Sequence, residues 1–244
     1  MEWFNRLYFG TWQLGGQFKQ LSRAQIKTLL NFALQSGIRR FDTAAAYGKG
    51  KVEEILGACL PSEAVVITKI SAASKPALGS PALIPDFYTP TLIRRSVKKS
   101  LERLRRDSVN TVLLHNWHPA WSSDAVEIMA TLDDLKKDGL VNRVGVSLPN
   151  GFNTRIDDAV LPYLDVIEAP FNPRERWVLD QLPDLLGLKK EVLLRSLLRQ
   201  GKLLKEGYTA KEILRETLSL NTSVVIGMTT EEQIIENISH LKGG

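Results

Sequence analysis

Short apolar runs alternate with segments of helical periodicity along the whole chain. Strands that are buried on both faces of a parallel sheet read as continuous apolar runs, and eight such runs are present. Eight strands that alternate with helices favour a (β/α)8 barrel, a TIM barrel, formed as a single domain over residues 1–244. The expected strands lie at residues 7–9, 38–41, 65–68, 111–114, 143–146, 166–168, 192–194 and 223–226.

Residues that cap helix N-termini precede several of the helical segments. A capping box pairs Ser or Thr with a Glu or Gln three residues later, and Pro is favoured in a first turn. An open, doubly wound sheet is the alternative fold, but it needs a G-x-G-x-x-G turn after its first strand, and the glycines of residues 10–16 follow a different order. The expected caps are Ser22 with Gln25, Thr209 with Glu212, Thr230 with Gln233, and Thr89 before Pro90.

The composition is that of an ordinary globular protein. The 244 residues are 43% hydrophobic and 24% charged, and no apolar run approaches the roughly 20 residues needed to cross a bilayer. The N-terminal residues lack the basic and apolar regions of a signal peptide, so a cytoplasmic location is expected. The single cysteine, Cys59, cannot form an internal disulfide, and we expect an inert, buried thiol.

The net charge of +5 raises the possibility of a nucleic-acid partner. Much of the excess lies in a stripe between Arg94 and Arg106, along one expected helix. Aromatic residues do not interleave with these charges, as they do on surfaces that bind single strands, so a solvated outer helix face is favoured. We therefore expect neither a nucleic-acid nor a membrane partner, and no pattern indicates the oligomeric state.

Polar side chains follow three successive expected strands at the point where each strand ends. Asp42 and Tyr47 follow the second strand, Lys69 the third and His115 the fourth. Because the carboxyl ends of barrel strands converge at one face, these four side chains are expected to meet there. Taken singly, Lys69 could be only a salt-bridge partner of Asp42, and His115 only a loop histidine; their occurrence together favours a reactive set.

This combination of side chains suits the reduction of a carbonyl group. A nearby ammonium favours the phenolate, so Lys69 would make Tyr47 a usable proton donor and, in reverse, a usable base. Asp42 would hold Lys69 charged, and His115 would donate a hydrogen bond to the substrate oxygen. A barrel lyase with Lys69 as a Schiff base is an alternative, although a pairing with Asp42 opposes the depressed pKa that such a lysine needs.

The chain resembles the aldo-keto reductase family over nearly its whole length. The resemblance implies a metal-free enzyme in which Asp42, Tyr47, Lys69 and His115 are catalytic and Tyr47 is the general acid. It also implies an NADPH or NADH cofactor over the barrel mouth and a small-molecule aldehyde or ketone as substrate. The matching motifs are Gly10-Thr11-Trp12, Phe41-Asp42-Thr43-Ala44 with Tyr47-Gly48, Glu53-Glu54-Ile55-Leu56-Gly57, Thr68-Lys69, Leu113-Leu114-His115-Asn116, Val144-Gly145-Val146-Ser147, Pro170-Phe171-Asn172, and Ile226-Gly227 followed by Gln233, Glu236 and Asn237.

Carried over by position, the resemblance implies a cofactor site with several departures from the family pattern. Ser147 matches the hydroxyl that usually holds the nicotinamide carboxamide, but Leu148 replaces the usual Asn and Glu168 the usual Gln. A buried, ionised Glu168 would need a partner. Arg195 stands where many members stack an aromatic ring on the nicotinamide. The expected cofactor-binding residues are Gly10, Thr11, Trp12, Asp42, Ser147, Glu168, Arg195, Ser196, Leu198, Gly227, Thr230, Gln233, Glu236 and Asn237.

The choice of coenzyme is less sharply indicated. The helix that Thr230 opens could receive a phosphate at its N-terminus. Residues 227–233, however, contain no Arg or Lys, and they carry Glu231 and Glu232. These features weaken the preference for NADPH that the resemblance implies, and NADH stays possible. A regulatory subunit that binds the nucleotide without turnover is the alternative function.

The substrate pocket is expected to be open. The chain ends soon after Asn237, so we expect it to lack the C-terminal extension that often shapes the pocket in this family. An open pocket predicts activity on bulky or polar carbonyls, such as oxidised sugars. Trp12, Trp117 and Trp121 are expected to line it, and residues 71–88, rich in Ser, Ala and Pro, are expected to form a long loop over the same face.

Overall fold

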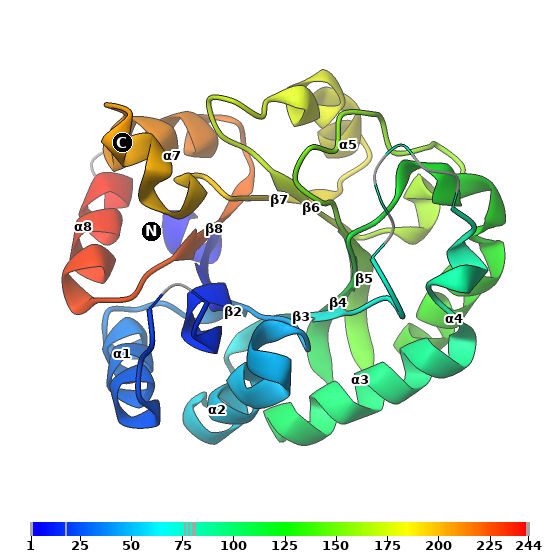
Figure 1. Cartoon of the computed structure of the whole chain (residues 1–244), viewed down its shortest axis with the longest axis horizontal. Helices are drawn as coiled ribbons and strands as arrows, with labels where there is room; N and C mark the ends of the chain where they lie inside the picture. The colour runs from blue at the N-terminus through cyan, green and yellow to red at the C-terminus, as the bar shows by residue number, and fades with distance from the viewer. Residues whose placement is uncertain (1, 18, 76, 78, 80–81, 243–244) are drawn as a thin grey trace.

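The computed structural model, which describes residues 2–17, 19–75, 77, 79 and 82–242, confirms the (β/α)8 barrel (Figure 1). Eight parallel strands pair in sequence order, and the last strand closes the ring on the first. Every expected strand is present, although the second begins at Arg40 rather than at residue 38. The strands are β1 (Leu7–Gly10), β2 (Arg40–Asp42), β3 (Val65–Ile70), β4 (Val109–His115), β5 (Val141–Ser147), β6 (Val166–Pro170), β7 (Glu191–Arg195) and β8 (Ser223–Gly227).

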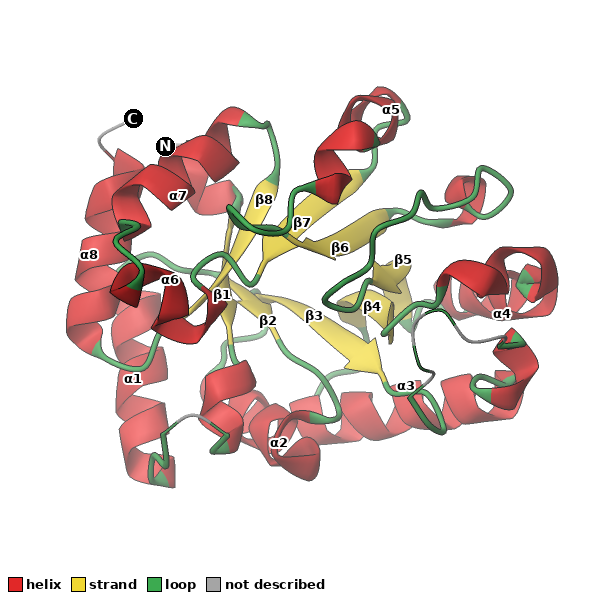
Figure 2. Ribbon diagram, turned by 45° about the horizontal axis from the view of Figure 1, so that its top comes forward, coloured by secondary structure: helices red, strands yellow, loops and turns green. Residues whose placement is uncertain are grey.

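The helices surround the ring of strands (Figure 2). Two of the expected capping boxes are complete, and the Thr89 hydroxyl accepts the amide of Leu92 at 3.1 Å. At the last helix the expectation is half wrong, because the side chain of Gln233 accepts from the amide of Thr229 rather than from that of Thr230. The helices are α1 (Arg23–Gln35), α2 (Lys51–Cys59), α3 (Pro90–Leu104), α4 (Val126–Lys137), α5 (Leu182–Gly187), α6 (Lys202–Lys205), α7 (Ala210–Ser219) and α8 (Glu231–Lys242).

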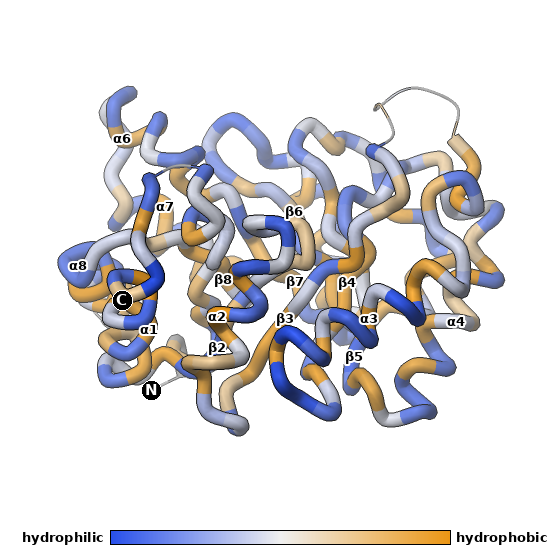
Figure 3. Tube along the Cα trace, turned by 60° about the horizontal axis from the view of Figure 1, so that its bottom comes forward, coloured by the Kyte–Doolittle hydropathy of each residue, from blue (hydrophilic) through white to orange (hydrophobic). Residues whose placement is uncertain are grey.

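Two hydrophobic layers hold the barrel together, one inside the ring and one between the strands and the helices. The period of two along each strand separates them, since neighbouring side chains point to opposite faces. Apolar strand segments accordingly lie at the centre of Figure 3, inside helices of mixed hydropathy. The inner cluster consists of Tyr8, Ile67, Leu113, Val166, Leu193 and Val225.

A hydrogen-bonded network lies below the inner cluster, near the N-terminal ends of the strands. Glu191 on β7 is its centre: it accepts from the hydroxyls of Ser223 at 2.8 Å and Tyr8 at 3.2 Å and pairs with Arg143. Arg40 in turn donates to the Tyr8 hydroxyl at 2.9 Å. This base network joins β1, β2, β5, β7 and β8 at the end of the barrel that faces away from the expected site.

The connection between β5 and β6 departs from regular alternation. Residues 148–165, all of which the structure describes, contain one 3-10 turn, Leu161–Tyr163, and no α-helix. Pro149, Asn150 and Gly151 at the start of this segment disfavour a helix there. Gln181 holds the segment in place: its side chain accepts from the amide of Ile156 at 2.9 Å and donates to the carbonyl of the same residue at 2.8 Å.

Three side chains of the basic stripe on and after α3 make contacts within the molecule. Arg94 pairs with Asp134 of α4 and with Asp138, which follows α4, at 2.9 and 3.2 Å, and Arg103 pairs with the buried Glu53 of α2. Arg106 donates to two backbone carbonyls, at 2.6 and 2.9 Å. These contacts support the interpretation of the stripe as a structural and solvated helix face.

Gly145 on β5 is required by the close approach of β6. A β-carbon at this position would overlap the carbonyl oxygen of Val166 and come within 2.9 Å of Leu113. We therefore expect Gly145→Ala to lower the free energy of unfolding by about 3 kcal/mol, because backbone of a central strand must move. Chemical denaturation measures the change, and Gly187→Ala, where a β-carbon would meet nothing within 4 Å, is the matched control. An equal stability of the two variants would contradict this account of the strand packing.

Candidate functional site

The side chains of the expected site form one layer at the carboxyl ends of the strands. Because side chains alternate, the residue two positions after each inward apolar residue also points into the barrel. The pairing of β1 with β2 and β8, and of β5 with β4 and β6, sets several of these positions side by side. This mouth layer comprises Gly10, Asp42, Lys69, His115, Ser147, Glu168, Arg195 and Gly227.

Lys69 is at the centre of the mouth layer and is fully buried. Its ammonium contacts the carboxylate of Asp42 and lies 3.5 Å from the hydroxyl of Tyr47. It also donates to the carbonyl of Thr43 at 3.3 Å. Burial alone would lower the pKa of Lys69, but Asp42 and then Glu168 outweigh that effect and raise it above its usual value. The structure thus brings together three of the four expected catalytic side chains, Asp42, Tyr47 and Lys69, and keeps the Lys69 ammonium charged.

Tyr47 follows β2 in a short 3-10 helix, Tyr47–Gly50. Burial raises the pKa of its phenol to about 12, although Lys69 acts in the opposite direction. The ammonium favours the phenolate, as expected, but in the free protein the desolvation of the phenolate has the larger effect on this pKa. In this state Tyr47 is a protonated phenol throughout the neutral range, which is the form that can donate a proton.

His115 completes the group at the end of β4. Its ring lies edge-on to the Tyr47 ring, with centroids 6.3 Å apart, and the Tyr88 hydroxyl sits 2.8 Å from the His115 carbonyl and 2.9 Å from that of Ile70. Burial, and then the charge of Lys69, lower the pKa of His115 to about 3. The imidazole is therefore neutral near pH 7, with one N–H available to donate.

This lowered pKa predicts a dependence of stability on pH. Below about pH 6.5 the unfolded chain binds a proton at His115 that the folded chain does not, so the free energy of unfolding falls with decreasing pH by up to about 1.4 kcal/mol per unit. His115→Asn should remove this contribution. Urea denaturation of both proteins at pH 7, 6, 5 and 4 tests this prediction. Between pH 7 and pH 4 the free energy of unfolding of the wild type should fall by over about 1 kcal/mol more than that of the variant. Parallel curves would show that His115 titrates normally in the folded protein.

Glu168 on β6 is fully buried between two cations, although among the described residues its Oε2 has no partner in hydrogen-bonding geometry. Its Oε2 lies 3.1 Å from Lys69 Nζ, and its Oε1 lies 3.1 Å from Arg195 Nε and accepts the Ser147 hydroxyl at 3.1 Å. Burial alone would raise the pKa of Glu168, but Lys69 and Arg195 hold it below its usual value. The Arg195 guanidinium also donates to the Leu148 carbonyl and, at 2.7 Å, to Asn150 Oδ1.

A cavity of about 870 Å³ opens above the mouth layer and extends across β8 to α7 and α8. Such a volume is typical of cofactor and substrate sites. Most of the expected site residues line it, whereas Lys69, Ser147 and Glu168 are buried without lining it, and Thr11 and Thr230 do not line it either. The expected residues that line the cavity are Gly10, Trp12, Asp42, Tyr47, His115, Arg195, Ser196, Leu198, Gly227, Gln233, Glu236 and Asn237.

The sequence profile of the aldo/keto reductase family matches residues 6–166. This chain belongs to the aldo/keto reductase family. The NADH-specific methylglyoxal reductase of Escherichia coli is 31% identical over 195 residues, which cover 73% of this chain and 58% of that protein. This chain spans about half the length of the first curated relatives it matches, three mycobacterial oxidoreductases.

Solved structures of aldo-keto reductases share the fold. The glycerol dehydrogenase from Gluconobacter oxydans aligns with a TM-score of 0.77 at 22% identity, over 98% of this chain and 86% of that one. An aldo/keto reductase from Klebsiella pneumoniae, in complex with NADP and acetate, aligns with a TM-score of 0.70 at 20% identity, over 97% and 85% of the two chains.

Several residues that line the cavity were not predicted from the sequence. Lys75, Asn116 and Asn150 lie on loops whose path no strand pattern predicts. Arg199 and Gln200 follow β7 and both adopt positive φ, at 46° and 59°, which non-glycine residues rarely do. Such strain marks functional segments, but the sequence alone gives no signal of it.

Two of the three tryptophans expected in the pocket are not there. Trp12 lines the cavity, whereas Trp117 and Trp121 are fully buried and pack edge-to-face with centroids 5.5 Å apart. Tyr88 packs against Trp121 in the same way, at 5.6 Å. The expectation was wrong because these rings pack against one another behind the ends of β3 and β4. Burial of their large apolar surfaces there stabilises the fold more than exposure to the cavity would. Part of the loop expected over residues 71–88 lies outside the described residues.

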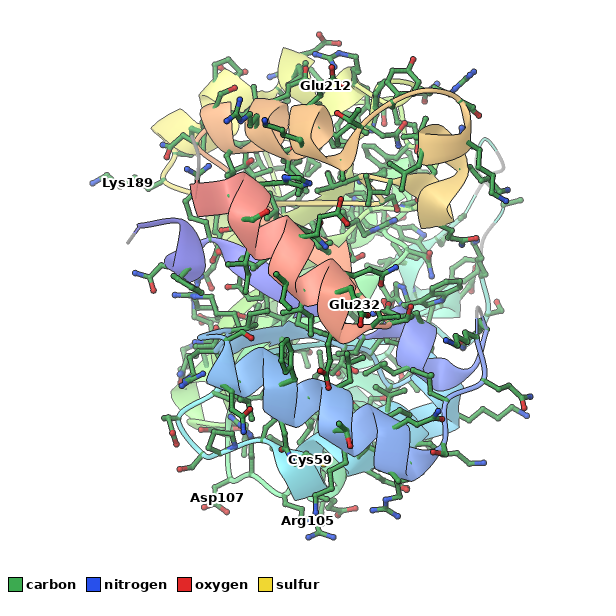
Figure 4. All side chains as sticks on the ribbon, turned by 90° about the vertical axis from the view of Figure 1, so that its left-hand side faces the viewer. Cys59, Arg105, Asp107, Lys189, Glu212 and Glu232 are labelled. Carbon is green, nitrogen blue, oxygen red and sulfur yellow. The ribbon has the colours of Figure 1, made fainter. Side chains whose placement is uncertain are left out.

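Other kinds of site find no support in the described part of the chain. Those residues contain no group of three or more His, Cys, Asp or Glu side chains that could hold a metal ion. No helix formed by them is long and apolar enough to cross a membrane. Cys59, at the end of α2 (Figure 4), is partly exposed, so the expectation of a buried thiol is wrong.

Proposed function

We propose that this chain reduces an aldehyde or ketone to the alcohol with a nicotinamide cofactor, NADPH in preference to NADH. One observation carries the proposal: a buried ammonium, Lys69, lies between the carboxylate of Asp42 and the phenol of Tyr47, beside the neutral imidazole of His115. The phenol and the imidazole both line the cavity, where a carbonyl oxygen can reach them. Membership in the aldo/keto reductase family supports the same activity.

The four side chains divide the proton chemistry among them. When bound, the cofactor supplies a hydride to the carbonyl carbon. The Tyr47 hydroxyl donates its proton to the carbonyl oxygen as negative charge develops there. Lys69, 3.5 Å from that hydroxyl, stabilises the phenolate that remains, and Asp42 keeps Lys69 in place. His115 donates a hydrogen bond to the same oxygen and aligns the carbonyl.

The cavity fits a dinucleotide cofactor. Gly227 and Gln13 both line it, and a β-carbon at Gly227 would come within 2.7 Å of the side-chain oxygen of Gln13. Arg199 brings a cation to the cavity wall, and Gln233 and Asn237 of α8 face the same space. We propose NADPH because, among the described residues, three cations, Lys75, Arg195 and Arg199, line the whole cavity against two carboxylates, Asp42 and Glu236. Glu231 and Glu232 in the first turn of α8 limit the preference.

A polar carbonyl compound is the substrate class that the cavity favours. Near Tyr47 and His115 the wall is formed by Trp12, Gln17 and Asn116, which offer one aromatic face and two amide groups. An aromatic face beside amide donors and acceptors suits a hydroxylated, sugar-like carbonyl. Turnover of small aliphatic aldehydes alone would contradict this part of the proposal.

The test is the loss of NADPH absorbance with a reactive aromatic aldehyde and with a panel of aldoses, repeated with NADH. We expect turnover with both coenzymes and a higher kcat/KM with NADPH. A higher value with NADH, as the name of the Escherichia coli relative would suggest, would reverse the coenzyme assignment. Absence of nucleotide binding would exclude the reductase altogether.

A second candidate function is a regulatory subunit that binds the nucleotide without turnover. The observation that favours it is the altered carboxamide site: the Ser147 hydroxyl is already committed to Glu168, and Leu148 is fully buried. Tight NADPH binding with no reduction of any carbonyl in the panel would support this function over the first.

A further inference from the structure

Glu168 and Asp42 hold the same ammonium from two strands that lie far apart around the ring. Asp42 approaches Lys69 from β2, and Glu168 approaches it from β6, with Oε2 3.1 Å from Nζ. Arg195 on β7 closes the row at 3.1 Å from the other oxygen of Glu168. Positive and negative groups therefore alternate along the row Arg195, Glu168, Lys69 and Asp42, and the phenol of Tyr47 lies 3.5 Å from the ammonium within this row.

We propose that Glu168 is a positioning residue of this site, which acts through Lys69 to keep Tyr47 protonated. The inference rests on the proposed function, in which Tyr47 is the proton donor, and deepens it. The resemblance drawn from the sequence implies a neutral amide at this position, where this chain has a carboxylate paired with Lys69 and Arg195.

The energetic cost of Glu168 argues against a passive role. A fully buried carboxylate is expensive, and a neutral Gln of the same shape could accept from Ser147 and contact Lys69 at much lower cost. Here Arg195, tied to Leu148 and Asn150, is held against Glu168 and offsets that cost. Lys69 on β3 and Arg195 on β7 therefore stabilise the ionised form of Glu168.

The charge on Glu168 acts on the phenol from its position against the shared ammonium. Lys69 attracts the phenolate whether or not Glu168 is present, but Glu168, 3.1 Å from that ammonium, adds a negative potential that offsets part of the attraction, so the phenolate is less favoured. The charged groups that face Tyr47 are Lys69, Asp42, Glu168 and Arg195, and Glu168 raises its pKa more than Arg195 lowers it. Burial, and then the negative charge of Glu168, likewise raise the pKa of Asp42, although Lys69 acts in the opposite direction.

The variant Glu168→Gln tests the inference without any turnover. We would label the tyrosines with carbon-13 at Cζ, assign the Tyr47 signal with Tyr47→Phe, and titrate the free protein by NMR. In the wild type, with a pKa of about 12, about one tenth of the phenol is ionised at pH 11. In Glu168→Gln we expect a tenfold lower proton affinity, so that about half is ionised at that pH.

Two further variants separate charge from structure. Glu127→Gln removes the same charge from the exposed start of α4 and should leave the Tyr47 signal unchanged. Should Glu168→Gln not fold, the double variant Glu168→Gln with Arg195→Gln replaces it and should also lower the Tyr47 midpoint, since the effect of Glu168 is the larger.

The outcomes are distinct from those of the activity test. A Tyr47 midpoint that is the same in a folded Glu168→Gln as in the wild type would overturn the inference, even if the enzyme reduces carbonyls. A lowered midpoint in a protein without measurable turnover would support the inference and contradict the proposed function. In an active enzyme, Glu168→Gln should in addition lose reduction at alkaline pH before the wild type does.

Discussion

Replacement of Tyr47 by phenylalanine is expected to lower kcat for carbonyl reduction by about 10³-fold, while the dissociation constant for NADPH changes by less than about threefold. The reason is that the phenol hydroxyl lies 3.5 Å from the Lys69 ammonium and lines the cavity, where its proton can reach the oxygen of a bound carbonyl. Its ring packs against neighbouring apolar side chains, and phenylalanine preserves that packing. Steady-state assays and fluorescence titration with NADPH measure the two quantities.

A matched control is Tyr163→Phe, which removes a hydroxyl from a tyrosine that is 45% exposed and does not line the cavity. Its turnover should equal that of the wild type. Unimpaired turnover in Tyr47→Phe would show that another group donates the proton. Loss of both turnover and nucleotide binding would instead show that Tyr47 has a structural role.

Replacement of Lys69 by methionine should be among the most destabilising single changes in the barrel. Asp42 and Glu168 would then lie buried without the ammonium that they share, and the loss of one partner of a buried ion pair costs about 3–5 kcal/mol. The loss should be larger at pH 8 than at pH 5, because unpaired buried carboxylates have raised pKa values and take up protons as the pH falls. Chemical denaturation at both pH values measures it.

Partner variants show whether the cost comes from charge or from packing. Combining Lys69→Met with Asp42→Asn and Glu168→Gln removes all three charges and should recover most of the lost stability. Lys189→Met is the control for the loss of an ammonium, since Lys189 projects from the surface in Figure 4. A Lys69→Met protein as stable as the wild type would mean that the two carboxylates are protonated in the native state.

The sequence predicted the fold and the meeting of the candidate catalytic side chains because both depend on local patterns. A strand buried on both faces shows itself as an apolar run, and the polar residue that ends the run belongs to the barrel mouth. Asp42, Lys69 and His115 each end such a run, so their meeting follows from barrel topology alone.

Contacts across the ring could not be predicted in the same way. The pairing of Glu168 with Lys69 joins β6 to β3, and it depends on the stagger of the strands once the barrel has closed. Trp117 and Trp121 were misplaced because loop conformation, rather than strand alternation, decides which way they point. The strained path of Arg199 and Gln200 depends on tertiary packing that overrides their own preferences.

The base network around Glu191 has a consequence for how such a protein can change. It joins five strands at the end of the barrel opposite the mouth layer. Tyr8 belongs both to this network, through its hydroxyl, and to the inner hydrophobic cluster. Substitutions in the cavity loops leave the base network unchanged, so a change of substrate specificity need not lower the stability of the barrel. Libraries that randomise residues such as Gln17, Asn116 and Asn150, and that keep the residues of the base network, should therefore retain a high proportion of folded members.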